Sequence, residues 1–343
     1  MNIKDGDQIL NEDEPFNIFD KDSDIDKQFR TYAKMWHPDF NKTNPKASDV
    51  FNHIIELKNI AKDRIAKGSW ISKNEMRIYG EDHTEYRIKF KKSHPFELGT
   101  MYISDSIIAY IIDSKYNNFY NNFVNQVSNL RYSSDKMKNE MNRFFPNIIK
   151  TIATDDDKLI IIVRKTDDQF LLKDVINYFG DKIDPRHVAW MISSLYNLCC
   201  YFEYKNISHL GISIDTCFVS MKYHSVSLLG GWWYTVNTGE KMIGIASKDF
   251  SSLPKDVQTS KMSSRSCDLE LLRAVGREAL GDKHGMKLRI NKDIPTPMSN
   301  WLIYPSKENA IKEYGIWYDK VLIDSYGKPK FIKCEISSDE LYR

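Results

Sequence analysis

Cysteine is scarce in this chain, and long apolar runs are missing. The five cysteines are odd in number and no two have CxxC spacing, so neither a disulfide framework nor a zinc site is indicated. The longest apolar strings, such as 159–163, have the length of a strand and fall far short of the roughly twenty residues that span a bilayer. The first residues are acidic and polar, unlike a signal peptide. The composition therefore predicts a cytoplasmic protein with buried thiols and argues against a secreted or membrane protein.

Neither sign of charge is in excess. Lys and Arg together number 49, and Asp and Glu 47, in a chain of 343 residues. The net charge therefore gives the protein no general electrostatic attraction to nucleic acid or to a membrane surface, and we expect neither as a partner. The length suits one small and one larger domain.

The tripeptide His37-Pro38-Asp39 is the most informative motif because of the segments around it. Before it, apolar residues at helical spacing predict a helix with one buried face, formed by Ile25, Phe29, Tyr32, Ala33 and Trp36. Three cations fall on the opposite face, namely Lys27, Arg30 and Lys34. Ser23 or Asp24 can cap the start of this helix, and Pro38 ends it because a proline disfavours helical geometry in the residue before it. After a polar loop, a second amphipathic helix is predicted over 50–65.

Two antiparallel helices joined by a loop that holds His-Pro-Asp resemble the J domain of DnaJ-like co-chaperones, over residues 14–64. The resemblance implies that His37, Pro38 and Asp39 engage the ATPase domain and linker of a DnaK-type chaperone. It also implies that the three cations of the helix meet acidic surface of that chaperone. Exposed cations suit this role because they steer encounter and raise the association rate. The alternative is a solvated helix face with an ordinary loop histidine and a helix-capping acid.

Residues 67–84 mix Gly, Ser and charged residues with few periodic apolar positions, so we expect a linker there. Long DnaJ-like proteins continue with a Gly/Phe-rich segment and Cys-rich zinc modules, and this sequence contains neither. The rest of the chain therefore does not resemble the usual client-binding apparatus of that family.

The remainder begins with predicted strands and continues with predicted helices. We expect strands over 86–90, 100–104, 107–113 and 158–164, and helices over 133–144 and 185–204. This order resembles the two lobes of protein kinases, and local motifs support the resemblance. In the sheet-rich part, Gly99-Thr100-Met101 resembles the end of a glycine loop, and Glu140 resembles the glutamate of the helix that precedes 145–150. In the helical part, 209–218 resembles the catalytic loop, and Leu229-Gly230-Gly231 stands in place of Asp-Phe-Gly. Leu253-Pro254 resembles the end of the activation segment, and Asp268 resembles the anchoring aspartate of the next helix.

The departures from the kinase pattern remove its chemistry. Phosphoryl transfer needs metal ions held by carboxylates and positive charge around the phosphates. The resemblance places Gly211 at the catalytic aspartate, Thr216 at the metal-binding asparagine, Leu229 at the metal-binding aspartate, and Ile111 or a neighbour at the strand lysine. Glu140 remains without its partner, and His94 and Phe96 stand where glycines would admit a phosphate. A pseudokinase is implied, with no catalytic residue, metal ligand or cofactor.

Each of three further features of this region allows both a structural and a functional interpretation. Asp215 lies one position away from the expected carboxylate, but a single carboxylate does not hold magnesium between phosphates. His209 is expected to pack in the core rather than to act in catalysis. The cluster Trp232, Trp233 and Tyr234 either packs between the activation segment and its lobe or anchors a protein partner, since Trp and Tyr dominate interface hot spots.

We therefore predict a multidomain protein with an all-α J domain (1–66) built on an antiparallel helix hairpin, a linker (67–84) and an α+β kinase-like bilobal domain (85–336). Its sheet-rich lobe covers about 85–166 and its helical lobe about 167–336, followed by a tail (337–343). The predicted function is that of a co-chaperone that stimulates a DnaK-type chaperone while the kinase-like domain recognises an unidentified protein client. Two alternatives stay open: an atypical phosphotransferase with a regulatory J module, and a viral protein, such as one from a phage, that sequesters the chaperone in the host cytoplasm.

Overall fold

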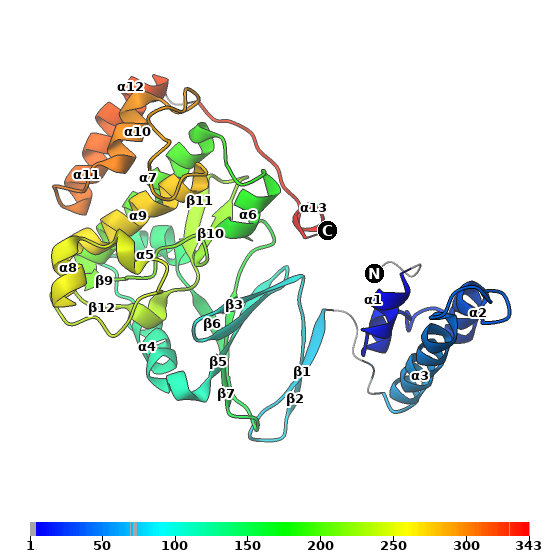
Figure 1. Ribbon diagram of the computed structural model, residues 1–343. Coiled ribbons are helices and arrows are strands. Elements are labelled where there is room, and N and C mark those ends of the chain that lie inside the picture. The colour runs from blue at the N-terminus through cyan, green and yellow to red at the C-terminus, as the bar shows by residue number, and fades with distance from the viewer. Residues whose placement is uncertain (1–4, 69, 71–73, 329, 343) are drawn as a thin grey trace. The chain divides into compact units, whose positions relative to one another are not determined.

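The computed structural model describes residues 5–68, 70, 74–328 and 330–342. The chain divides into two compact units, Met1–Phe90 and Lys91–Arg343, and each is described by itself (Figure 1). Helices and several separate sheets are both present, so the predicted mixture of helix and strand is confirmed. Within the described ranges, no helix has the length and apolar character needed to cross a membrane.

The smaller unit contains both helices predicted around the His-Pro-Asp triplet. Its elements are α1 (Gly6–Leu10), the 3-10 turn η1 (Pro15–Asn17), α2 (Ile25–Trp36), α3 (Ala47–Ala66), β1 (Glu75–Tyr79) and β2 (Glu85–Lys89). The carboxylate of Asp24 caps α2 by accepting hydrogen bonds from the backbone N–H groups of Asp26 and Lys27. The helix ends at Trp36, directly before the triplet, as the proline predicts.

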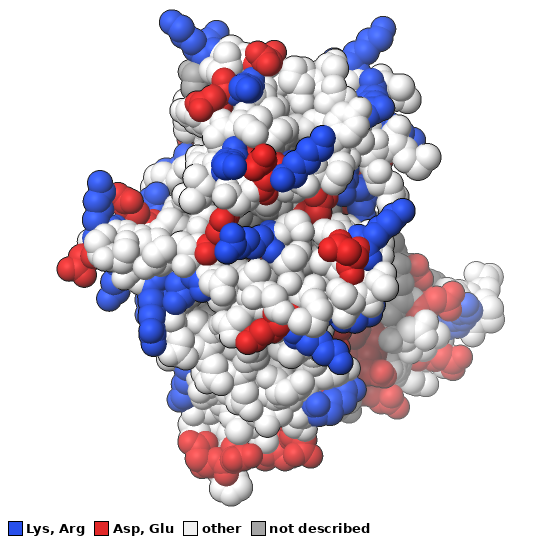
Figure 2. All heavy atoms as spheres, turned by 90° about the vertical axis from the view of Figure 1, so that its left-hand side faces the viewer, with Lys and Arg blue, Asp and Glu red and all other residues white. Residues whose placement is uncertain are grey.

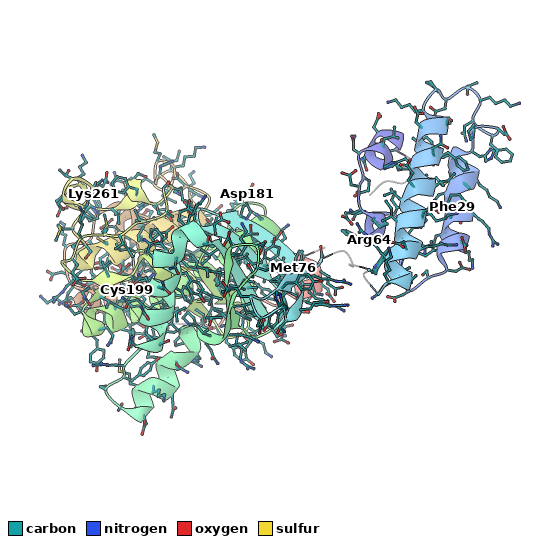
Figure 3. All side chains as sticks on the ribbon, turned by 90° about the horizontal axis from the view of Figure 1, so that it is seen from below. Phe29, Arg64, Met76, Asp181, Cys199 and Lys261 are labelled. Atoms are coloured by element: carbon teal, nitrogen blue, oxygen red, sulfur yellow. The ribbon has the colours of Figure 1, made fainter. Side chains whose placement is uncertain are left out.

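The helices of the smaller unit share a core of their own, in which α2 and α3 lie side by side (Figure 3). Ile25 and Trp36 of α2 pack with the buried face of α3, formed by Val50, Ile54, Leu57 and Ala61. Helix α1 approaches closely at Gly6, where an added Cβ would lie 2.9 Å from the ring of Trp36. An ion pair between Lys62 and Asp26 (2.6 Å) joins α2 to α3 at the surface.

The segment predicted as a linker is in part regular. Strand β1 lies within 67–84 and pairs antiparallel with β2, which matches the strand predicted over 86–90. Arg77 of β1 donates hydrogen bonds to the carbonyl oxygens of Gly68 and Trp70. Hairpin pairing supplies order that the weak apolar pattern of β1 does not reveal. Positions 69 and 71–73 of the predicted linker, and residue 343 of the predicted tail, lie outside the described residues.

The larger unit begins with a five-stranded antiparallel sheet. Its strands are β3 (Lys92–Phe96), β4 (Gly99–Ile103), β5 (Ile107–Asp113), β6 (Asn147–Ala153) and β7 (Lys158–Arg164), in the spatial order β3-β4-β5-β7-β6. Strands β4, β5 and β7 match prediction, whereas β3, with its Pro95, and β6 were not predicted as strands. Gly99 is required where β4 meets β5, because an added Cβ would lie 1.9 Å from the carbonyl oxygen of Ile111.

Two helices connect β5 to β6, and the prediction found only one of them. These are α4 (Asn117–Ser128), which follows the turn η2 (Ser114–Tyr116), and α5 (Asp135–Met141), which runs into the turn η3 (Asn142–Phe144). The prediction of a helix over 133–144 matches α5 and η3. Helix α4 was missed because five of its twelve residues are asparagine, which has low intrinsic helix propensity. Its Phe123 is nevertheless fully buried against the sheet, so tertiary packing stabilises the helix.

The rest of the larger unit is mainly helical. The long helix α7 (Pro185–Lys205) is the one predicted over 185–204. The other α-helices are α6 (Leu172–Tyr178), α8 (Lys255–Ser260), α9 (Arg265–Ala279), α10 (Thr296–Ile303), α11 (Ala310–Ile316), α12 (Leu322–Tyr326) and α13 (Ser338–Leu341). The π turn η6 (Trp317–Val321) joins α11 to α12, and two short turns are η4 (Trp232–Tyr234) and η5 (Phe250–Ser252). Small sheets join β8 (Phe170–Leu171), β10 (Cys217–Ser220) and β11 (Ser225–Leu228), and pair β9 (Ile207–Ser208) with β12 (Val236–Asn237).

A buried ion pair ties the helices of this region together. The guanidinium of Arg273 on α9 donates to Glu313 of α11 at 2.6 Å and also to the backbone oxygen of Trp301. Both side chains are almost fully buried. Loss of either partner would leave an uncompensated charge in the core, which costs about 3–5 kcal/mol.

Charge and thiols are distributed much as the composition predicts. On the face in Figure 2, positive and negative side chains are interspersed and separated by uncharged surface. All five cysteines are free; Cys199, Cys217 and Cys267 are buried, whereas Cys200 and Cys334 are partly exposed.

Candidate functional site

The His37-Pro38-Asp39 triplet forms a turn that packs against α3 on one side and is exposed to solvent on the other. The His37 ring packs edge-on against Phe51 of α3, with centroids 5.0 Å apart. Its Nδ1 accepts a hydrogen bond from the backbone N–H of Asp39. The side-chain amide of Asn41 closes the turn by donating to the backbone oxygens of Met35 and His37. The Asp39 side chain is 81% exposed, with one carboxylate oxygen 3.7 Å from His37 Nδ1, so the hydrogen-bonded turn presents an exposed carboxylate to solvent.

The predicted cationic face of α2 is present and unpaired. Lys27, Arg30 and Lys34 are all exposed, and none makes an ion pair within the described part of the chain. By contrast, two cations of the neighbouring helix α3 are paired, Lys62 with Asp26 and Arg64 with Glu14. The triplet follows directly after the helix that carries the cationic face. We call these residues together the triplet surface (Lys27, Arg30, Lys34, His37, Pro38 and Asp39).

In the larger unit, the loop after β9 is anchored by one buried carboxylate. Asp268 of α9 accepts hydrogen bonds from the backbone N–H groups of His209 (2.7 Å) and Leu210 (2.8 Å). Leu210 has a left-handed conformation (φ 60°), which these two bonds stabilise. Burial lowers the pKa of His209 to about 3, so its imidazole is neutral. Its ring stacks on Phe202 and meets Trp232 edge-on, in agreement with a packing role.

The residues at the expected catalytic positions make close contacts within and behind the loop. Gly211 lies against Gly231, and a Cβ added at Gly211 would be 2.5 Å from the Gly231 carbonyl oxygen. The Thr216 hydroxyl donates to the backbone oxygen of Gly211 (2.5 Å) and is thereby used within the loop. Leu229 is buried, and its carbonyl oxygen accepts a hydrogen bond from Tyr110 of β5. A carboxylate at position 211 therefore has no room in this backbone arrangement.

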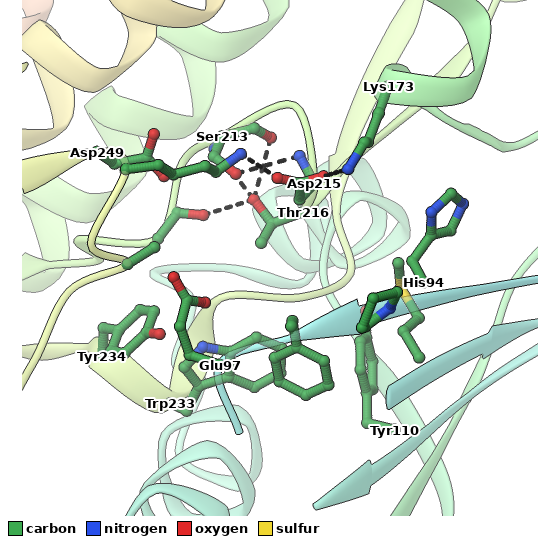
Figure 4. Close-up of a pocket in the computed structure, with 16 residues that line it drawn as sticks. His94, Glu97, Tyr110, Lys173, Ser213, Asp215, Thr216, Trp233, Tyr234 and Asp249 are labelled. Atoms are coloured by element: carbon green, nitrogen blue, oxygen red, sulfur yellow. Dashed lines mark hydrogen bonds and ion pairs between the residues drawn. The ribbon is translucent and has the colours of Figure 1, made fainter. Parts of the chain in front are cut away.

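A pocket of about 250 Å³ lies between the sheet and this loop (Figure 4). It is smaller than the roughly 300–1,000 Å³ of typical small-molecule sites. Aromatic rings fill its sheet side: Trp233 stacks between Phe96 of β3 (5.1 Å) and Phe123 of α4 (5.5 Å). Trp232, Trp233 and Tyr234 are all buried. Of the two interpretations of this cluster, the structure favours packing, because rings buried in this way are not available to a partner.

Asp215 lines the pocket as a paired carboxylate. It contacts the ammonium of Lys248 on one side and that of Lys173 (3.0 Å) on the other. Although burial by itself disfavours its charged form, the two lysines hold the pKa of Asp215 below its ordinary value. An anionic carboxylate between two cations is committed to them and is a poor base. His94, predicted to crowd a phosphate, instead bonds Asp174 of α6 at 3.0 Å.

The structure places the residues that the resemblance matched to the helix glutamate and the strand lysine. Glu140 lies on α5, is exposed and does not line the pocket. The helix that meets the segment after Leu229 is α4, whose Asn122 donates to the backbone oxygens of Trp233 and Thr235. On β5 the side chain that lines the pocket is that of Tyr110, a direct neighbour of Ile111 and so within the expected positions. The sequence did not point to Asn122, because α4 itself was not predicted.

No protein-family model matches this chain, and no curated protein matches it. Within the described residues, no group of three or more His, Cys, Asp or Glu side chains is arranged to hold a metal ion. The triplet surface and the loop anchored by Asp268 are therefore interpreted from their own geometry.

The anchor makes stability depend on pH in a defined direction. Burial raises the pKa of Asp268 from 3.8 to about 6, against the opposing effect of its two backbone hydrogen bonds. Between these values the folded protein keeps a proton that the unfolded chain has lost, so the contribution of this group to stability falls as pH rises. From roughly pH 4.5 to 7 the unfolding free energy of the protein should fall by about 2 kcal/mol relative to that of Asp268→Asn.

Denaturant unfolding of both proteins across this pH range tests the prediction. Asp256→Asn, which removes an exposed carboxylate from α8, is the matched control for the loss of one acid. A difference between the protein and Asp268→Asn that does not change with pH would show that Asp268 ionises at its ordinary value in the fold.

Proposed function

We propose that this protein is a J-domain co-chaperone that uses the triplet surface to engage a DnaK-type chaperone and to stimulate its ATPase. The observation that carries the proposal is the presentation of Asp39, an exposed carboxylate on a turn held by the His37–Phe51 contact. This turn comes directly after the cationic face of α2, whose three side chains make no ion pair with the described residues. A rigid turn delivers one charged group to a defined place, while the cations steer the encounter. The proposal implies a cytoplasmic location, where such a chaperone would be met.

The larger unit, in this proposal, is a kinase-like module without catalysis that recognises a protein client. Three observations support it: a five-stranded sheet followed by a mainly helical region, the Asp268 anchor beneath 209–210, and the position of Leu229-Gly230-Gly231 next to the anchored loop. The alternative of an atypical phosphotransferase is disfavoured by the Gly211–Gly231 contact and by the pairing of Asp215 with two lysines.

Substitution within the triplet should abolish stimulation without unfolding the protein. Because Asp39 is exposed, Asp39→Asn should change the unfolding free energy by no more than about 0.5 kcal/mol, yet remove the charged group from the turn. His37→Gln should likewise abolish stimulation, with a larger loss of stability because it also removes the ring that packs against Phe51. Single-turnover ATP hydrolysis by a DnaK-type chaperone, with and without the full chain, is the measurement.

The matched control is Asp22→Asn, an exposed acid of the same unit outside the triplet surface, which should stimulate fully. Full stimulation by Asp39→Asn and His37→Gln together would refute the assignment. Tight binding without stimulation by the unaltered chain would instead favour the chaperone-sequestering alternative.

Charge reversal on α2 should act mainly on association. Lys27→Glu, Arg30→Glu or Lys34→Glu should slow binding to the chaperone severalfold and leave dissociation nearly unchanged, because exposed charges steer encounter. Added salt should reproduce the effect, since the Debye length is roughly 10 Å at 0.1 M. Surface plasmon resonance measures both rates. Lys89→Glu, an exposed site on β2, is the control, and salt-independent association would contradict an electrostatic role for this face.

The protein should transfer no phosphate, and restoring the missing aspartate should not rescue transfer. Gly211→Asp should also destabilise the larger unit by about 1–3 kcal/mol, because its Cβ meets the Gly231 backbone. Gly315→Asp on α11, where an added Cβ meets nothing within 4 Å, controls for the new charge. Radiolabel transfer from magnesium ATP and thermal unfolding are the measurements. Phosphate transfer by the unaltered chain, lost in Asp215→Ala, would establish the phosphotransferase alternative.

A further inference from the structure

A second cavity in the larger unit lies apart from the aromatic pocket. Its volume is about 370 Å³, within the roughly 300–1,000 Å³ range of small-molecule sites. Three segments enclose it: the turn 142–147 before β6, the connection 164–169 after β7, and the hairpin of β10 and β11. Neither the triplet surface nor the anchored loop uses this cavity.

Two arginines on its wall have no acidic partner. Arg143 and Arg164 are exposed, and neither makes an ion pair with the residues that the structure describes. The guanidinium of Arg143 lies over the Phe144 ring, 4.6 Å from its centroid. Stacking orients the guanidinium plane while its N–H edges stay available, which is the arrangement that favours bidentate recognition of an oxyanion.

A third cation lies behind the two arginines. Lys165 is only 5% exposed, and its ammonium donates to the backbone oxygens of Asp105 and Thr166. Burial lowers the pKa of Lys165 to about 8, against the attraction of Asp105, Asp167 and Asp168, so the group is still mainly charged at pH 7.

The acids near these cations do not neutralise the arginines. Asp168 is the one carboxylate of the described cavity wall, and it accepts a hydrogen bond from the Ser220 hydroxyl. Asp105 contacts Lys91 and Ser338. The described cavity wall carries three cations and one acid, and Asp105 and Asp167 act on Lys165 from outside the wall. Arg143 and Arg164 are therefore the two positive charges that a dianion would balance.

The floor of the cavity is apolar. Phe144, Phe145 and Leu229 are buried there, and Tyr223, 64% exposed, stands on the wall. We propose that this cavity binds a phosphate monoester with an apolar or aromatic organic part, the phosphate facing Arg143 and Arg164. A phosphate monoester carries about −1.5 to −2 charges at pH 7, which matches the excess on the wall. The phosphate is carried either by a free small molecule or by a phosphorylated side chain of a peptide.

Isothermal titration of the full chain with phenyl phosphate tests the assignment. Arg143→Gln and Arg164→Gln should each weaken binding by at least about tenfold, because each removes a charged fork from the phosphate. The matched control is Arg289→Gln. Arg289 is likewise exposed, lies over an aromatic ring (Tyr304, 5.1 Å) and has no ion-pair partner among the described residues, but it is not part of the cavity. Its loss should leave the affinity unchanged.

Further ligands separate the elements of the proposal. Benzoate and inorganic phosphate should both bind more weakly than phenyl phosphate, since one lacks the second charge and the other lacks the ring. A phosphotyrosine peptide that binds more tightly than phenyl phosphate identifies a peptide source, and equal affinity identifies a small molecule. Absence of phenyl phosphate binding up to millimolar concentration, or an equal loss in Arg289→Gln, would overturn the proposal. Chaperone stimulation does not depend on this cavity, so the two proposals fail separately.

Discussion

The buried carboxylate of Asp268 is the contact on which the centre of the larger unit depends. Its two oxygens accept the backbone N–H groups of His209 and Leu210 and so hold Leu210 in a left-handed conformation. Burial disfavours the charged carboxylate and the two N–H groups offset only part of that cost, so the pKa of Asp268 stays above its ordinary value. The chain leaves this anchor at Gly211 and passes directly against Gly231. The position of the whole loop, and of the aromatic segment behind it, follows from this one attachment.

Around this anchor, packed or paired side chains occupy the positions at which the resemblance to kinases would place catalytic and metal-binding groups. Tyr110 bonds the Leu229 backbone, Trp233 lies between Phe96 and Phe123, and Asp215 is held by Lys173 and Lys248. Each of these side chains is committed to contacts with its neighbours. In the proposed kinase-like module, no single substitution is therefore expected to create a phosphoryl-transfer site, because groups that act as a unit are non-additive.

The smaller unit has its own apolar core, separate from that of the larger unit. This core, rather than the surface ion pairs, fixes the angle at which α2 presents its cations, because exposed pairs contribute little to stability. Trp36 is central: it ends α2, packs under Gly6 and leaves His37 at the start of the turn. The stability of the packed face and the exposure of the charged face are thus two consequences of one amphipathic pattern.

Periodicity and turn chemistry in the sequence determined α2, α3, α7 and the strands β4, β5 and β7, because each carries its apolar pattern locally. The exposure of the triplet surface follows from the same pattern. Only the tertiary structure decided the rest. Helix α4 is rich in asparagine and is stabilised by Phe123 against the sheet, and β1 is ordered by its hairpin partner. The burial of Trp232 and Trp233, the hydrogen bond from Asn122 to the Trp233 backbone, and the meeting of Arg143 with Arg164 at one cavity depend on contacts between distant segments. Spacing along a chain indicates which residues lie on the same face of a helix or strand. The packing of the whole unit decides which segments come into contact.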